Sequence, residues 1–313
     1  MDDWALAADQ HGIVSMLELR RAGLTSAQIE ALVRHRRLTR LARGWYAVQP
    51  PAGADHRHVL TTRAMLRAHD GRAIAGHHSA LLLLGLPTYG ADLETVRLNR
   101  REVGSPRTRA GQRLGRAVPL EGQLEHTVVP ALAVVQHGIS AGSLSALVAA
   151  DAFVRSGGSV EDLGVALGWV RYHPHTTQLR SALDRVDGRH ESPGETLLGH
   201  ALHVMGVAST PQVAITDGSF RAVVDFLVDK RVVIEFDGRV KYGRPSDTPD
   251  PFGRKQSPEQ VLWQEKARED HLRELGYEVL RVTWADLQNP IALASRIRAA
   301  IERALRRNGL QTA

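Results

Sequence analysis

The sequence predicts a multi-domain protein of the mixed α/β class, and three observations support this prediction. The chain has 313 residues, which exceeds the usual size of a single domain. Segments with apolar residues at helical spacing are interspersed with short apolar runs typical of strands. Residues 50–54 form a proline- and glycine-containing linker between two regions of different pattern. We therefore expect three domains, at residues 1–49, 55–190 and 191–313.

Residues 1–49 have the element order of a winged helix-turn-helix. A short helix is expected over residues 14–21, and Thr25 is placed to cap a second helix. Two strands within residues 38–48 complete a hairpin. In this motif the second helix enters the major groove of DNA. We therefore expect a DNA-binding domain whose contacts come from Thr25, Ser26, Gln28, Arg34, Arg36, Arg37, Arg40 and Arg43.

Residues 55–190 are expected to form a middle α/β domain, with a basic, glycine-rich passage over residues 100–116 that predicts a loop or an irregular hairpin. The arginines between residues 97 and 116 suit a solvated loop and a track of phosphate contacts equally well. The basic run at residues 34–37 also suits a solvated helix end, although the hairpin that follows favours the DNA interpretation. Helices are expected over residues 58–69, 77–84, 130–136, 143–154 and 159–170, and a strand over residues 95–98.

Residues 191–313 predict an αβββαβ order of elements. Ser192 and Glu195 have the spacing of a capping box at the start of the first helix. A polar segment from residue 239 to 258 separates the third strand from the next helix. Three strands, a helix, a fourth strand and a terminal helix are expected at residues 212–215, 222–228, 232–237, 258–275, 278–283 and 291–305.

Acidic residues on two of these strands are the strongest functional signal in the sequence. Glu235 and Asp237 are two residues apart on a strand and therefore point to the same face. Asp225 follows the preceding apolar run, and it faces Glu235 if residues 229–231 form a three-residue turn. Unpaired carboxylates are costly to bury, whereas converging carboxylates suit a divalent ion, Mg²⁺ or Mn²⁺. We expect hydrolysis by metal-bound water, with Asp225, Glu235, Asp237 and the Phe236 carbonyl as ligands and Glu195 assisting through water.

The composition favours DNA as the partner. The formal net charge is +6, from 40 lysines and arginines against 34 acids, and only four of the basic residues are lysines. The absence of cysteine excludes disulfides and thiolate zinc sites and fits a cytoplasmic location. No membrane partner is expected, because the longest apolar run is too short to span a bilayer. A homodimer is left open. Histidines that invite a zinc interpretation, without a second ligand set, are His56, His58, His77, His78, His173 and His175.

The C-terminal third resembles the PD-(D/E)xK nuclease superfamily, in the branch related to very-short-patch repair endonucleases. The resemblance implies that Asp225 and Glu235 bind magnesium and that Glu195 assists. Asp237 stands where that superfamily usually has a lysine, so Lys241 or Lys266 becomes the candidate for the displaced amine. The resemblance rests on Gly194-Glu195, Val224-Asp225-Phe226, Ile234-Glu235-Phe236-Asp237-Gly238 and the segment from Trp263 to Arg281.

The first 190 residues resemble the AbiEi-type antitoxin family, through Arg36-Arg37-Leu38-Thr39-Arg40, Arg43-Gly44-Trp45-Tyr46 and the segment from His78 to Pro87. This resemblance implies binding to operator DNA, repression of transcription and a cognate toxin protein as partner. The sequence as a whole therefore predicts a DNA-binding protein with a magnesium-dependent, endonuclease-like domain. The alternative is a transcriptional repressor or antitoxin whose nuclease fold is catalytically silent.

Overall fold

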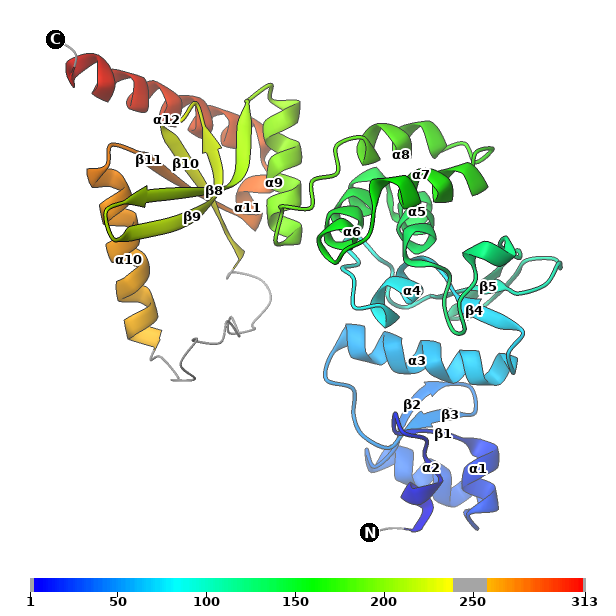
Figure 1. Ribbon diagram of the computed structural model, residues 1–313. Coiled ribbons are helices and arrows are strands. Elements are labelled where there is room, and N and C mark those ends of the chain that lie inside the picture. Colours follow the sequence, from blue (N-terminus) through cyan, green and yellow to red (C-terminus); the bar gives the residue numbers. More distant parts are fainter. Residues whose placement is uncertain (1–2, 239–257, 312–313) are drawn as a thin grey trace. The chain divides into compact units, whose positions relative to one another are not determined.

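The computed structural model describes residues 3–238 and 258–311, and it has the mixed α/β, multi-domain organisation that the sequence predicts (Figure 1). The chain divides into two compact units, Met1–Val186 and Asp187–Ala313, here called unit 1 and unit 2. Unit 1 contains two separate β-sheets and unit 2 contains one.

A winged helix-turn-helix forms the start of unit 1. Its three strands form a sheet in the order β1-β3-β2, and the side chains of Val14, Leu19, Ile29 and Tyr46 make its core. The predicted first helix starts later than expected, because Ser15 caps it and the residues before it form a strand. The elements are η1 (Asp3–Ala7), β1 (Ile13–Ser15), α1 (Met16–Arg21), α2 (Ser26–Arg34), β2 (Thr39–Ala42) and β3 (Trp45–Ala47).

The rest of unit 1 packs helices on a second sheet of order β4-β5-β7-β6. The basic passage after residue 100 forms the β6–β7 hairpin, as one of the two predicted forms, and β7 also pairs with β5 in parallel. The elements are α3 (Ala54–His69), β4 (Ala73–Ala75), α4 (His77–Leu83), β5 (Val96–Arg100), β6 (Arg107–Arg109), β7 (Gln112–Gly115), η2 (Leu120–Gly122), α5 (Pro130–Ala141), α6 (Ser143–Arg155), α7 (Val160–Trp169) and α8 (Thr176–Leu183).

Unit 2 has the predicted αβββαβ order around a sheet of order β11-β10-β9-β8. The parallel pair β10 and β11 is joined through α10, as a parallel connection requires. One apolar cluster joins the sheet to α9 and α12, and a second, which contains Leu272 of α10, includes Val224 and Val233. The elements are α9 (Pro193–Val204), β8 (Ser209–Asp217), β9 (Phe220–Val228), β10 (Val232–Asp237), α10 (Pro258–Glu274), β11 (Glu278–Thr283), α11 (Trp284–Leu287) and α12 (Pro290–Gln311).

Candidate nucleic-acid interface and acidic site

Helix α2 has a fully formed N-terminal cap and a buried inner face. The Gln28 N–H donates to Thr25 Oγ1 at 3.3 Å, and the Thr25 N–H donates to Gln28 Oε1 at 2.8 Å. This capping box satisfies backbone groups that the first turn of a helix leaves without partners. Ile29 is fully buried in the core of the winged helix. Thr25 and Gln28 therefore determine where α2 begins, and the burial of Ile29 determines which face of the helix is exposed to solvent.

The residues predicted to contact DNA are all exposed, and they lie on α2, on the turn after it and on the β2–β3 hairpin. Several of them also have partners within the protein, in addition to the capping pair of Thr25 and Gln28. Ser26 Oγ accepts a hydrogen bond from Arg20 Nη2 at 2.6 Å, and the Arg40 guanidinium lies 5.7 Å from the centre of the Tyr46 ring. The exposed set is Thr25, Ser26, Gln28, Arg34, Arg36, Arg37, Arg40 and Arg43.

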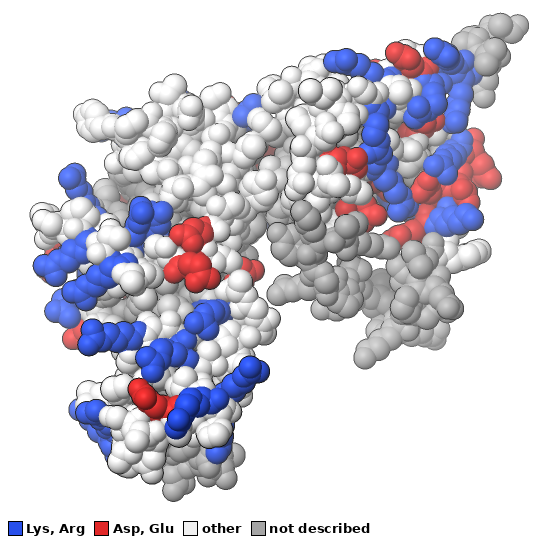
Figure 2. Space-filling view, turned by 180° about the vertical axis from the view of Figure 1, so that it is seen from behind, with Lys and Arg blue, Asp and Glu red and all other residues white. Residues whose placement is uncertain are grey.

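The net positive charge of the protein belongs entirely to unit 1. Residues 1–186 contain 22 arginines, no lysine and 16 acids, a difference of +6, whereas residues 187–313 contain 18 basic and 18 acidic residues. On the face that Figure 2 shows, the charged side chains of unit 1 are mainly basic, whereas in unit 2 basic and acidic side chains are intermixed. The net positive charge, which attracts phosphate, thus lies in the unit that carries the winged helix.

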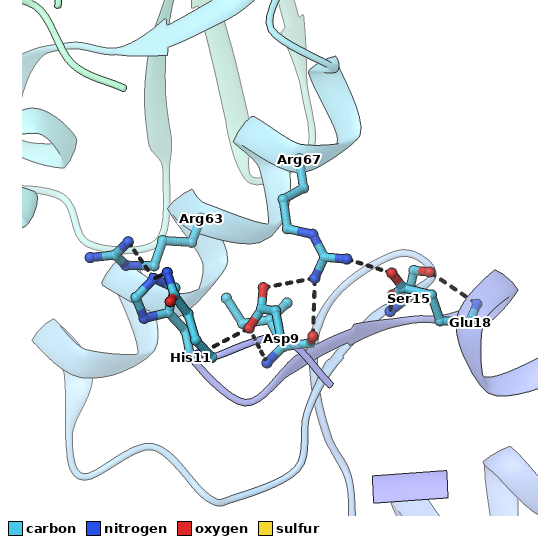
Figure 3. Close-up of polar contacts among 8 residues, drawn as sticks. Asp9, His11, Ser15, Glu18, Arg63 and Arg67 are labelled. Atoms are coloured by element: carbon cyan, nitrogen blue, oxygen red, sulfur yellow. Dashed lines mark hydrogen bonds and ion pairs between the residues drawn. The ribbon is translucent and has the colours of Figure 1, made fainter. Parts of the chain in front are cut away.

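Arg67 of α3 makes several polar contacts with the winged helix (Figure 3). Arg67 Nη1 donates to Asp9 Oδ2 at 2.8 Å and to the Ile13 carbonyl at 3.0 Å, and Nη2 donates to Glu18 Oε1 at 2.5 Å. The guanidinium also lies 4.9 Å from the centre of the Trp45 ring. Burial pulls the pKa of Glu18 upward, but hydrogen bonds from Ser15 and the charge of Arg67 outweigh it and lower that pKa. Arg67 therefore holds β1, α1 and β3 in place relative to α3.

The arginines of the middle sheet divide between its two faces. Arg107 and Arg109 of β6 are exposed. Arg97 of β5 lies beside Arg113 of β7 in parallel register, and burial together with the charge of Arg113 lowers the pKa of Arg97. The Nε of Arg97 is buried and has no hydrogen-bond partner among the described residues. These arginines remain candidates for phosphate contacts. The sequence left two interpretations open for them, a solvated loop and a track of phosphate contacts.

In unit 2, the strand register brings the two key acids together. Val232 pairs with Val228 and Ile234 pairs with Phe226, so the next position in this register sets Glu235 opposite Asp225. The predicted three-residue turn is confirmed, and two of its residues, Asp229 and Lys230, have positive φ. Directly opposed residues of an antiparallel pair point to the same face. Asp225 Oδ2 also accepts the Phe236 N–H at 2.7 Å, which fixes the Asp225 side chain.

Glu195 reaches the same region because α9 approaches β10 very closely. Gly194 makes this possible, since a Cβ at that position would lie 1.9 Å from the Phe236 ring. Glu195 is buried, and it accepts hydrogen bonds from the Glu191 N–H at 2.8 Å, from Ser192 Oγ at 2.7 Å and from Gln212 Nε2 at 2.9 Å. Gln212, which the sequence analysis missed, has a φ of +53° and lies opposite Asp225 in the β8–β9 register.

The charges at this site are partly balanced by an arginine whose contact with Glu235 was not expected from the sequence. Arg268 of α10 has its Nη2 2.6 Å from Glu235 Oε1 and donates from the same nitrogen to the Val223 carbonyl at 2.6 Å. Burial raises the pKa of Asp225 to about 6, and the charges of Glu195 and Glu235 act in the same direction. The Phe236 N–H and the charge of Arg268 oppose this rise.

The remaining predicted site residues have different positions. Asp237 pairs in register with Thr283 at the end of β10. Lys266 is exposed on α10, and Lys241 lies outside the described residues. Trp263, at one end of the segment in the nuclease resemblance, is 73% exposed, because it lies near the start of α10, away from the end of the helix that packs on the sheet through Leu272.

A divalent ion, which the nuclease resemblance implies, does not fit this arrangement as it stands. Asp225 and Glu235 offer hard oxygen ligands, and Glu235 Oε1 is buried without a hydrogen bond of good geometry. However, no three His, Cys, Asp or Glu side chains within residues 3–238 and 258–311 gather closely enough to hold a metal ion. The guanidinium of Arg268 occupies the cationic position beside Glu235. The magnesium site therefore stays a prediction.

Within residues 3–238 and 258–311, none of the helices has the length and apolar character needed to span a bilayer.

Comparison with known proteins identifies one similar segment. No curated protein and no solved structure gives a significant match to the chain. Residues 5–49, which are the winged helix-turn-helix of unit 1, match the model of a family described as a transcriptional regulator, the AbiEi antitoxin.

Proposed function

We propose that this protein is a transcriptional regulator that binds double-stranded DNA through its winged helix-turn-helix. The observation that carries the proposal is the match of residues 5–49 to a family of transcriptional regulators, on a segment that folds as a winged helix. In that fold the second helix, here α2, reads the major groove. The exposed outer face of α2 and the basic hairpin after it provide the contacts.

The distribution of charge supports the same proposal. Binding to DNA depends strongly on neutralising phosphates with basic side chains, and the whole excess of basic residues lies in unit 1. Arginine also suits bidentate contacts with phosphate and with guanine. A protein of this kind acts where the DNA lies, so the predicted cytoplasmic location stays part of the proposal.

The proposal is tested by measuring binding to the protein's own promoter region at several salt concentrations. Arg34 and Arg43 are exposed and lie on α2 and on the hairpin turn. The double variant Arg34→Ala/Arg43→Ala should weaken binding by roughly 10-fold or more and reduce the salt slope by about 2. Arg180→Ala removes one exposed arginine from α8, at the other end of unit 1 from α2 (Figure 1), and is the control.

Two outcomes would contradict this function. The first is DNA binding that is equally weak for all sequences and insensitive to the Arg34→Ala/Arg43→Ala change. The second is an equal loss of binding in the Arg180→Ala control, since that would place the contacts elsewhere on unit 1.

A cognate toxin protein is a partner that we infer from the same match, because the matched family is described as an antitoxin. The product of the neighbouring gene should co-purify with this protein when the two are expressed together. A neighbouring product that neither binds nor inhibits growth when expressed alone would refute the antitoxin part of the proposal and leave the regulator intact.

Hydrolysis of DNA by unit 2 is a second candidate function, and it would require a divalent ion to displace Arg268 from Glu235. It is favoured by the strand register, which extends to Asp225 opposite Glu235, with Glu195 nearby. To test it, the purified natural protein is incubated with plasmid and linear DNA in the presence of manganese, and the Glu235→Ala variant is incubated separately under the same conditions. Cleavage that disappears in the variant would support the enzyme. Cleavage that persists in the variant indicates a contaminant, and no cleavage by the natural protein supports a silent nuclease fold.

A further inference from the structure

Arg268 is the feature of unit 2 that neither the sequence motifs nor the comparisons assign. It lies on α10, and its guanidinium contacts Glu235 Oε1 and the Val223 carbonyl, both at 2.6 Å from the same nitrogen. Val223 and Asp225 are two residues apart on β9, so the guanidinium is held against the strand that carries Asp225. An arginine side chain anchored at two points has a defined position rather than a range of solvated ones.

The surroundings of Arg268 are strongly acidic. The Glu235 side chain is only 15% exposed, and the charges of both Glu195 and Glu235 act on Asp225. Carboxylates held this close repel one another unless a cation lies among them. Of the three described side chains whose charges shift the pKa of Asp225, Glu195 and Glu235 are acidic and Arg268 is basic. Lys266 is two positions away on the same helix and therefore does not share the face of Arg268.

We propose that Arg268 takes the place of a divalent cation in this acidic site, so that the protein in its resting state holds no metal there and gains a metal site only when the arginine is removed. The proposal goes beyond regulation of transcription and does not rest on DNA binding. It predicts that the natural protein binds neither Mg²⁺ nor Mn²⁺ at this site, whereas a variant that lacks Arg268 does bind them.

The direct test is a titration with Mn²⁺, followed by the loss of the electron paramagnetic resonance signal of the free ion. Arg268→Ala is expected to bind at least about tenfold more tightly than the natural protein. The double variant Arg268→Ala/Asp225→Asn should lose this binding again, because a neutral amide replaces one carboxylate. Arg273→Ala is the matched control, since it removes an arginine of the same helix whose ion-pair partner at 2.6 Å, Glu269, lies outside this group of acids.

Thermal melting gives a second readout. With about 10 mM MnCl₂ the midpoint of Arg268→Ala should rise by a few degrees, whereas that of the natural protein should not change. Arg268→Gln serves as a second variant, because it removes the charge but retains an amide that can donate to the Val223 carbonyl. Circular dichroism establishes that each variant is folded before the titration.

Three results would overturn the proposal. One is Mn²⁺ binding by the natural protein as tight as that of Arg268→Ala. Another is a folded Arg268→Ala or Arg268→Gln that binds no Mn²⁺. The third, which needs no Arg268 variant, is a rise in the melting midpoint of the natural protein with Mn²⁺ that Asp225→Asn abolishes. None of these results depends on whether the protein binds its promoter, so failure here and failure of the proposed regulator function are separate outcomes.

Discussion

At the scale of single residues, the position of the partly buried Asp225 can be predicted from the sequence, but its neighbours on other elements cannot. Its opposition to Glu235 follows from the period of a strand and the length of the turn, and both are local properties. The contacts of Arg268 with Glu235 and of Gln212 with Glu195 were not predicted, because these two residues come from α10 and β8. Such contacts depend on packing that no local pattern encodes. A short-range pattern therefore located the acids, and the tertiary structure determined what neutralises them.

Asp225→Asn is predicted to stabilise unit 2 at neutral and alkaline pH. Burial raises the folded-state pKa of Asp225 to about 6, above its ordinary value of 3.8. The ionised form is therefore disfavoured in the fold above pH 6. The isosteric amide removes that charge and can still accept the Phe236 N–H. We expect a gain of roughly 1–3 kcal/mol in unfolding free energy at pH 8, measured by urea denaturation.

The same comparison at low pH supplies the control for Asp225. As pH falls through 6 the natural side chain takes up a proton in the folded state, so the difference between the two proteins should shrink and vanish near pH 4. A stability difference that is the same at pH 8 and pH 4.5 would mean that the ionisation of Asp225 is not its cause.

At the scale of elements, the order of helices and strands was largely predictable, and the exceptions have physical reasons. The αβββαβ order of unit 2 and the hairpin of the winged helix were predicted correctly. Strands β1 and β4 were missed because each has three residues, too few to show a period. The position of α9 against β10 was also unpredictable, because it depends on the space left by one glycine.

Gly194→Ala is predicted to destabilise unit 2, although alanine is the better helix former. The new methyl group would lie 1.9 Å from the Phe236 ring, so α9 or β10 must move. We expect a loss of about 1–3 kcal/mol in unfolding free energy, measured by thermal or urea denaturation. Gly164→Ala on α7 is the matched control, because no atom lies within 4 Å of its added Cβ. That control should be neutral or stabilising by up to about 1 kcal/mol, and an equal loss in both variants would refute the close-approach argument.

Arg67→Ala is predicted to loosen the winged helix from α3. The change removes hydrogen bonds to Asp9, Glu18 and the Ile13 carbonyl, and it leaves two half-buried carboxylates without their counter-charge. We expect a loss of about 1–3 kcal/mol in the unfolding free energy of unit 1, measured by calorimetry. Arg63→Ala on the same helix removes a single contact, at 2.9 Å to His11, and should cost less than about 1 kcal/mol. If the two variants were equally stable, Arg67 would not be the main fastening.

At the scale of the whole molecule, composition indicated a basic protein but not where the charge lies. The division at residue 186 shows that unit 1 carries the whole excess and that unit 2 is balanced. The two units also differ in the titratable groups whose pKa values are strongly shifted. Unit 1 contains the buried histidines His58, His78 and His137, with ring centres 5.0 and 6.1 Å apart in succession. Unit 2 contains Asp225, which is partly buried and has a raised pKa. The two units should therefore respond to pH in opposite directions.

The histidines make unit 1 weaker as the solution becomes acidic. Burial, the largest cause, lowers the pKa of both His78 and His137 to about 4, and the charge of Arg97 acts in the same direction on both. His137 donates from Nε2 to the Tyr89 carbonyl, and its Nδ1 is buried without a hydrogen-bond partner among the described residues, which fits a neutral ring. The unfolded state binds more protons than the folded state between pH 6.5 and about 4. The stability contributed by these neutral rings is complete above pH 6.5 and is lost as pH falls through that window, by about 1–3 kcal/mol for each ring.

Unit 2 should gain stability over part of the same window, because Asp225 binds its proton more readily in the folded state below pH 6. Calorimetry at pH 7.5, 6 and 5 is therefore predicted to show two unfolding transitions that move apart, with that of unit 1 falling. His137→Gln should reduce the decrease in the transition temperature of unit 1 at low pH, and Asp225→Asn should remove the increase in that of unit 2. His126→Gln changes a side chain that is 66% exposed and should alter neither transition. Acids with lowered pKa values weaken the fold only below about pH 4.5, outside this window; they are Glu18 and Asp92 in unit 1 and Asp187 and Asp286 in unit 2. Transitions that fall together between pH 7.5 and 5 would refute the assignment of opposite buried charges to the two units.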